Sequence, residues 1–121
     1  MQSIVLITNC SQILNLINSQ CKGDDIISYT KENQLNIDMV NGRVYITLSN
    51  EIVEDFEYDE IQNIYNIFPD AIFFYLMCYT NNAVLKKIIQ QLTFQEKVYV
   101  DDDRGNIFTF TEFKEYCLHT L

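Results

Sequence analysis

Alternating apolar residues on both sides of an Asn-Gly pair are the feature that most constrains the fold of this chain. Segments 35–39 and 44–48 both alternate apolar with polar residues, and Asn41 and Gly42 lie between them. Such alternation is typical of a strand with one buried face. Asn-Gly favours a type I′ turn, in which both residues have positive φ. We therefore expect an antiparallel hairpin here, extended to a meander by a short strand over 26–29.

Helix-like and strand-like stretches are interleaved along the rest of the chain. The apolar run 71–79 has no polar alternation, which predicts a central strand covered on both faces. The stretch 71–101 is typical of a right-handed βαβ crossover. The predicted order is β-α-β-β-β-α-β-α-β-β-α over a single domain, 1–121. This order indicates an α/β (α+β) class, with a mixed, mostly antiparallel sheet and about four helices.

Polar pairs spaced three residues apart predict where helices begin, because each residue of the pair can bond the other's backbone N–H. The pairs are Asn9 with Gln12, Asp59 with Gln62, and Thr109 with Glu112. The second pair predicts a helix over 60–67, ended by Pro69. The last helix is expected to turn Phe113, Tyr116, Cys117 and Leu121 inward.

Acidic residues are concentrated in one segment. The chain has 17 acidic and 8 basic residues, a net charge of -9, and positions 44–85 contain seven acids without a lysine or arginine. Six of these acids fall within ten residues: Glu51, Glu54, Asp55, Glu57, Asp59 and Glu60. A field of one sign repels nucleic acid and anionic lipid and accelerates encounter with a basic partner. We therefore expect a basic protein as partner, with no binding to nucleic acid or membrane.

Large apolar residues stand among these acids. Phe56 and Tyr58 surrounded by carboxylates match the composition of a binding hot spot, in which apolar residues lie centrally and charges at the rim. Two alternatives remain open. Phe56 and Val53 can instead pack onto the core, and the acids can simply keep the surface solvated.

Asp101, Asp102 and Asp103 form a second acidic patch. Their spacing does not fit a calcium-binding EF-hand loop, because Gly105 stands where an oxygen ligand is needed. The strand-like residues on both sides favour a solvated hairpin turn. A second contact point for a partner is the alternative.

No stretch of the sequence has the pattern of a common catalytic or metal site. His119 is the only histidine, and the three glycines form no phosphate-binding loop. The four cysteines are at least eleven positions apart, which favours reduced thiols over a disulfide framework or zinc site. We expect no enzyme activity and no cofactor. An enzyme would instead need a closed pocket holding a carboxylate of strongly raised pKa.

The N-terminal segment has no basic residues before its short apolar stretch, and the longest apolar run in the chain has nine residues. From these two observations we expect no signal peptide and no membrane span, and therefore a cytoplasmic protein.

A family resemblance adds to these expectations. A small, acidic chain without a catalytic signature, closing on the segment VYVDDDRGNIFTFTEFKEY (98–116), resembles immunity proteins of bacterial polymorphic-toxin and contact-dependent growth inhibition systems. The similar segment covers under a fifth of the chain and assigns no residue roles. The resemblance implies tight binding to the C-terminal domain of a cognate toxin.

Two functions are therefore expected from the sequence. The first is an immunity protein that neutralises a basic toxin domain, with a nuclease as the first candidate, as a monomer or weak homodimer. Its contacts would be the six acids of 51–60, Phe56 and Tyr58, with the patch 101–103 as a second surface. The alternative is a non-enzymatic binding or scaffold module whose acidic segment serves solubility or another partner.

Overall fold

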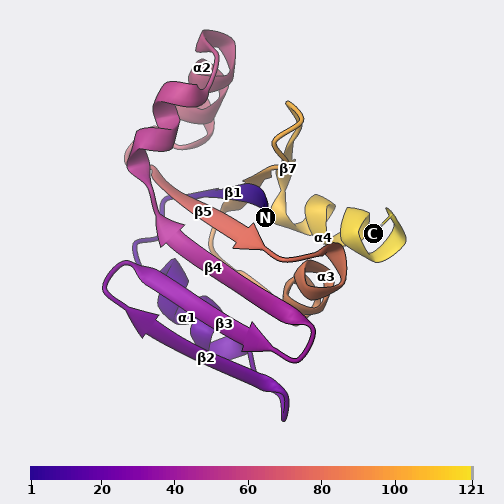
Figure 1. Ribbon diagram of the computed structural model, residues 1–121. Helices are drawn as coiled ribbons and strands as arrows, with labels where there is room; N and C mark the ends of the chain where they lie inside the picture. Colours follow the sequence, from indigo (N-terminus) through magenta and orange to yellow (C-terminus); the bar gives the residue numbers. More distant parts are fainter. Residues whose placement is uncertain (121) are drawn as a thin grey trace.

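The structure, a computed structural model, describes residues 1–120, and Figure 1 shows its strands and helices. The elements follow the predicted order, with one 3₁₀ helix, η1, added after the fourth strand. In chain order they are β1 (Gln2–Thr8), α1 (Ile13–Gln20), β2 (Ile26–Lys31), β3 (Gln34–Met39), β4 (Gly42–Leu48), η1 (Asn50–Asp55), α2 (Tyr58–Ile67), β5 (Phe73–Tyr79), α3 (Asn82–Gln91), β6 (Val98–Asp101), β7 (Ile107–Thr109) and α4 (Phe110–Thr120). The predicted class of interleaved helices and strands is confirmed.

All seven strands belong to one sheet, in the order β2-β3-β4-β5-β1-β6-β7. Every neighbouring pair in this sheet is antiparallel, so the sheet contains no parallel pair of adjacent strands. β5 and β6 run in the same direction, as a βαβ crossover requires, but β1 lies between them. The N-terminal strand therefore separates the two strands that would otherwise form a parallel pair.

The turn of the β3–β4 hairpin lies one position earlier in the chain than predicted. Met39 pairs with Gly42, so Val40 and Asn41 form the turn and Gly42 begins β4. Among residues 1–120, Glu32 and Asp103 are the only residues other than glycine with positive φ, so Asn41 does not adopt the type I′ conformation.

Gly42 is required for a different reason. A Cβ atom placed on it would lie 2.9 Å from Thr80 Cβ and 3.0 Å from Val84 Cγ2, and its φ is 151°. The glycine therefore lets β4 approach the connection between β5 and α3 closely.

The two faces of the sheet are covered differently. On one face α1, α3 and α4 pack over a large core that includes Leu6, Ile37, Met77, Ile88 and Phe113. The other face has a smaller apolar cluster under η1 and α2, with five buried members: Val5, Ile7, Ile64, Phe68 and Phe74. Its strands β1, β5, β6 and β7 are the covered half of this second face, and β2, β3 and β4 are the open half (Figure 1).

Within the run 71–79, residues Phe73–Tyr79 form the central strand β5, which contributes to both clusters. Tyr75 and Met77 point into the large core, and Phe74 points into the smaller cluster on the opposite face. Successive side chains of a strand point to opposite faces, so a strand covered on both sides must be apolar throughout. The expectation of a strand covered on both faces is confirmed for this stretch.

Two of the three predicted helix starts are wrong. α1 begins at Ile13, and Asn9 lies before it in a bend stabilised by Thr8, whose Oγ1 accepts a hydrogen bond from Cys10 N at 3.1 Å. α2 begins at Tyr58, earlier than predicted, because Glu60 Oε1 accepts a hydrogen bond from Glu57 N at 3.1 Å. The Asp59–Gln62 pair therefore lies inside the helix.

The third helix start is confirmed. Glu112 Oε1 accepts a hydrogen bond from Thr109 N at 2.9 Å, and Thr109 Oγ1 accepts one from Glu112 N at 3.2 Å. Phe113 and Cys117 are buried by α4, and Tyr116 packs against them. The inward orientation predicted for Leu121 lies outside the described residues.

Candidate functional site

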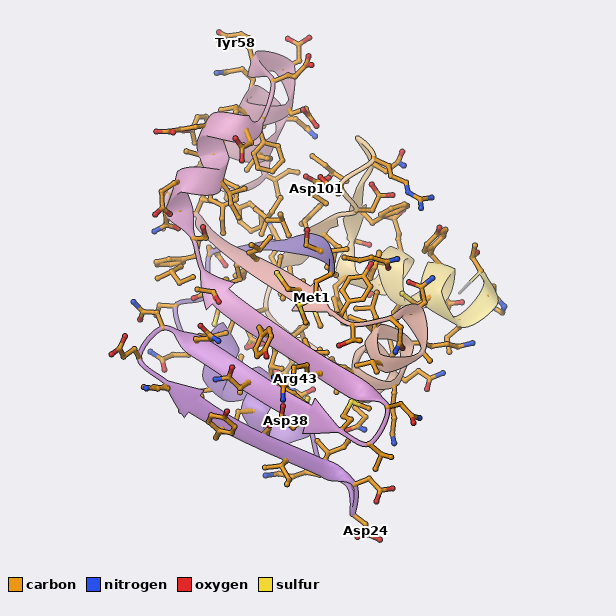
Figure 2. All side chains as sticks on the ribbon, in the orientation of Figure 1. Met1, Asp24, Asp38, Arg43, Tyr58 and Asp101 are labelled. Atoms are coloured by element: carbon orange, nitrogen blue, oxygen red, sulfur yellow. The ribbon has the colours of Figure 1, made fainter. Side chains whose placement is uncertain are left out.

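A cavity of about 350 Å³ lies between the η1–α2 segment and the hairpin of β6 and β7. Its acidic lining comes from both patches of the sequence: Asp55 and Glu60 on one side, Asp101 and Asp103 on the other. Figure 2 shows Asp101 between the segment that carries α2 and the β6–β7 hairpin. Acids more than 40 positions apart in the sequence therefore share one site.

Strand register explains the floor of this cavity. Val5 of β1 faces Leu76 of β5 on one side and Asp101 of β6 on the other. Directly opposite residues in antiparallel strands project from the same face of the sheet. The side chain of Asp101 is therefore placed beside an apolar floor formed by Val5 and Leu76.

This position changes the titration of Asp101. Partial burial raises the pKa of its carboxyl group, and the nearby negative charges of Glu60 and Asp102 raise it further. A hydrogen bond from Asp103 N to Asp101 Oδ1, at 3.2 Å, lowers the pKa and compensates in part. A cation in the cavity would relieve the cost of ionising this group.

The three aspartates of the hairpin have different roles. The carboxylate of Asp102 accepts hydrogen bonds from Arg104 N at 2.9 Å and from Asn106 N at 3.2 Å. Its Oδ2 accepts another from Asn106 Nδ2 at 3.1 Å, so Asp102 shapes the turn. Asp101 and Asp103 line the cavity instead. The predicted hairpin turn is thus confirmed, and Asp102 is bonded within it.

Phe56 points inward. It is partly buried against the small cluster, and its ring centroid lies 5.7 Å from that of Phe74. One part of Phe56 still lines the cavity. The alternative that Phe56 packs onto the core therefore describes its position, and Phe56 is a wall of the site instead of an exposed contact.

Tyr58 points outward. It is 76% exposed at the first residue of α2, and Figure 2 shows it at the outer end of the molecule. Most acids of the segment are exposed on the same connection and helix start: Glu51, Glu54, Asp55, Glu57 and Asp59. The predicted contact residues are thus divided between an exposed ridge at 51–59 and the cavity beside it.

The carboxylates of the cavity have no basic partner within residues 1–120. Salt bridges in this part of the chain join Arg43 to Asp38 and His119 to Glu115, and neither pair lies at the cavity. Among the described residues, the carboxylates of the site are therefore without a salt bridge, which leaves them available to a positively charged group of a partner.

Sequence reasoning missed the apolar and small residues that complete the cavity: Ser3, Val5, Ile52 and Leu76. Alternation in the first strand indicates that Ser3 and Val5 share a face opposite Leu6. No sequence pattern identifies β1 as the strand between β5 and β6, so their place beside Asp101 was not predictable.

The titratable side chains of the lining are all carboxylates. The lining includes no histidine, cysteine or lysine. No group of three histidine, cysteine, aspartate or glutamate side chains in residues 1–120 converges to hold a metal ion. Chemically, this arrangement can attract and neutralise a cationic group.

The cysteines lie elsewhere. All four are free thiols, and burial raises the pKa of Cys21 and of Cys117 to about 11. Both thiols are therefore protonated at neutral pH and belong to the large core. In addition, the described residues contain no helix that is both long and apolar enough to cross a lipid bilayer.

Comparisons with known proteins add no identification. No family model, curated protein or solved structure matches the chain.

Proposed function

We propose that this chain is an immunity protein that binds and neutralises the C-terminal domain of a cognate basic toxin, a nuclease being the first candidate. The observation that supports the proposal is the cavity in which Asp55, Glu60, Asp101 and Asp103 lie together without a basic partner in residues 1–120. The proposed place of action is the cytoplasm of the producing cell.

The charge of the site suits a nuclease as target. A nuclease holds phosphates with lysine and arginine side chains, and carboxylates can occupy the same positions as the phosphates. The exposed ridge at 51–59 would guide the encounter from a distance, and the cavity would receive one or more cationic side chains. A stoichiometric inhibitor of this kind needs no catalytic group.

The apolar floor of the cavity gives the complex a second source of stability. Lysine and arginine have long aliphatic stems that pack on apolar surface while their charged ends pair with acids. Val5 and Leu76 form such a surface directly beside Asp101. Attraction between charges would therefore set the association rate, and this apolar contact would slow dissociation.

Binding in the cavity should be linked to pH through Asp101. Its pKa is raised in the free chain, and a neighbouring cation would lower it. At a pH where Asp101 is protonated in the free chain, complex formation releases that proton, so affinity should rise with pH through the titration of Asp101 and then level off.

The proposal expects the gene directly upstream to encode the toxin, and the deciding experiment is co-expression with the C-terminal domain of that gene product. Formation of a complex and rescue of growth would support the proposal. A purified chain that neither binds that domain nor protects cells from it would refute the immunity function and leave the alternative of a general binding module.

A charge-reversal series then tests the binding face. Glu54→Lys, Asp55→Lys and Glu57→Lys together should slow association about tenfold or more at low ionic strength and flatten its salt dependence. The matched control reverses Asp24, Glu32 and Glu96, which are exposed and lie outside both acidic patches. Equal slowing in the two triple variants would show that only net charge matters and would remove the ridge as the binding face.

A further inference from the structure

The strand β2 is an unprotected edge of the sheet. It pairs with β3 through all six of its residues and has no neighbour on its other side, as Figure 1 shows. The opposite edge, β7, is only three residues long. β2 contains no proline and pairs with β3 in continuous register, so two of the usual protections of an edge strand are absent.

The turn that follows β2 determines which backbone groups point outward. Lys31 pairs with Gln34 across the two-residue turn of Glu32 and Asn33. The pair that closes such a turn is hydrogen-bonded, and alternate residues of the strand bond to alternate sides. The N–H and C=O groups of Ser28 and Thr30 therefore point away from β3, as does the C=O of Ile26, whose N–H donates a hydrogen bond to Gly23 O at 3.2 Å.

The side chains of β2 add an apolar strip to this edge. Ile27 is 67% exposed and Tyr29 is 49% exposed, although both are large and apolar. They lie on the open half of the second face, opposite the core-facing Ile26. The edge thus offers both unpaired backbone groups and apolar surface.

We propose that β2 pairs antiparallel with β2 of a second copy of this chain, centred on Ser28, so that the two seven-stranded sheets become continuous. In this register Ser28 faces its own counterpart, and Ile26 faces Thr30 of the second copy. The Ser28 pair forms two hydrogen bonds, and each Ile26–Thr30 pair forms one, from Thr30 N–H to Ile26 C=O, because Ile26 N–H already donates to Gly23 O. Ile27 then lies opposite Tyr29 of the second copy, on one face.

Charge complementarity selects this register and this occupant. The residue before the strand, Asp25, lies opposite Lys31 of the second copy, and symmetry produces this ion pair twice. Shifting the register by two residues in either direction separates these charges. Beyond the strand, the turn residue Asp24 comes opposite Glu32 of the second copy, so a like-charge contact flanks each ion pair. A second copy therefore supplies the complement of this edge in its backbone groups, its apolar side chains and the Asp25–Lys31 pair.

Repulsion between two acidic chains does not prevent this contact. Asp101 lies five strands away from β2, about 24 Å at the usual strand spacing, and charges are screened over about 10 Å at moderate salt. Pairing of two short strands buries less than the roughly 1,200 Å² typical of stable complexes. The dimer should therefore be weak and should form only at high protein concentration.

The test uses sedimentation equilibrium of the full chain over a wide concentration range. Wild type should shift from monomer to dimer as concentration rises. Asp25→Lys and Lys31→Asp should each raise the dimer dissociation constant about tenfold, because each replaces two ion pairs by two like-charge contacts. The double variant should restore the wild-type constant.

Asp24→Lys is the matched control for Asp25→Lys. It changes the net charge equally, but Asp24 comes opposite Glu32 of the second copy and not opposite Lys31, so its reversal should not weaken the dimer. Ser28→Pro should abolish the dimer, since it removes the central outward N–H without removing a bond to β3. Urea unfolding of each variant checks that the monomer remains folded.

Several outcomes would overturn the proposal. They are a wild-type chain that stays monomeric at every concentration, a dimer that survives Asp25→Lys and Lys31→Asp unchanged, or a double variant no better than either single one. Amide exchange provides a residue-level readout, because the N–H groups of Ser28 and Thr30 should gain protection with concentration. Protection confined to other residues would assign the contact to a different surface.

Discussion

The covered and open halves of the second sheet face differ in whether their charged side chains form ion pairs. On the open half, Asp38 and Arg43 are direct cross-strand partners, 3.5 Å apart, and Arg43 Nη1 donates a hydrogen bond to Tyr45 OH at 2.6 Å. On the covered half, the carboxylates of the cavity have no basic partner among the described residues. The open half therefore pairs two of its charged side chains with each other, and the covered half leaves the carboxylates of its cavity without a salt bridge.

This contrast separates two kinds of surface on one sheet. The apolar residues of α2 and η1 pack onto the covered half, and the acidic residues of the same two helices therefore lie on that half as well. The open half has no covering helix, so its strands place polar groups opposite one another and leave an unpaired edge at β2. The first surface suits a charged partner, and the second suits another strand.

The largest expected effect concerns the apolar support of the covered half. Phe74→Ala should cost about 3–5 kcal/mol of unfolding free energy, because Phe74 is buried in the small cluster and contacts Phe56. Tyr29→Ala, on the open half, should cost less than about 1 kcal/mol, since Tyr29 is half exposed. Urea unfolding measures both. Equal costs would show that η1 and α2 do not form a packed layer.

A pair of glycines gives the next test, with one glycine in each half. Gly42→Ala should destabilise the protein by about 2–3 kcal/mol, since the new Cβ meets Thr80 and Val84 and φ is unfavourable. A Cβ atom placed on Gly105 would meet no atom within 4 Å, so only the φ of 83° opposes Gly105→Ala. This substitution should cost about 1 kcal/mol of unfolding free energy. A larger cost at Gly105 would contradict the close approach of β4 to β5–α3.

Phe56 and Tyr58 should behave differently although they are two positions apart. Phe56→Ala should lower stability by about 1–2 kcal/mol, because the ring is partly buried against Phe74. Tyr58→Ala should leave stability within about 0.5 kcal/mol, since the side chain is exposed. Under the immunity proposal it should weaken toxin binding instead. Calorimetric titration with the toxin domain, beside urea unfolding, separates the two effects.

The smallest expected effects are pH-dependent changes in stability, which have opposite signs for Asp101 and Glu112. The pKa of Asp101 is raised in the folded chain, so its contribution to stability is present at low pH and is lost as pH rises through that pKa. Asp101→Asn should therefore raise stability slightly at neutral pH. The pKa of Glu112 is lowered by its hydrogen bonds with Thr109, so its contribution is present at neutral pH and lost on acidification.

Glu112→Gln should accordingly reduce stability at neutral pH and have little effect at acidic pH. Unfolding midpoints of both variants at the two pH values provide the measurement. If Asp101→Asn destabilised the protein at neutral pH, partial burial would not be the main influence on that carboxyl group.

Local patterns were sufficient to predict most elements, because each depends on residues close in sequence. Alternation around residues 35–48 predicted β3 and β4, and the apolar run at 71–79 predicted a central strand. The cap of Thr109 and Glu112 was also predictable, since its two hydrogen bonds join residues three apart. The starts of α1 and α2 were not, because a turn at Thr8 and the competing pair Glu57–Glu60 displaced them.

The sequence by itself determined the charge of the protein, the order of its strands and helices, and the concentration of acids in 51–60. Only the tertiary structure decided that Phe56 packs inward and that Asp101 and Asp103 line the same cavity as Asp55 and Glu60. The physical reason is strand order. β1 lies between β5 and β6, and pairing between residues so distant in sequence depends on the whole packed sheet instead of any local pattern.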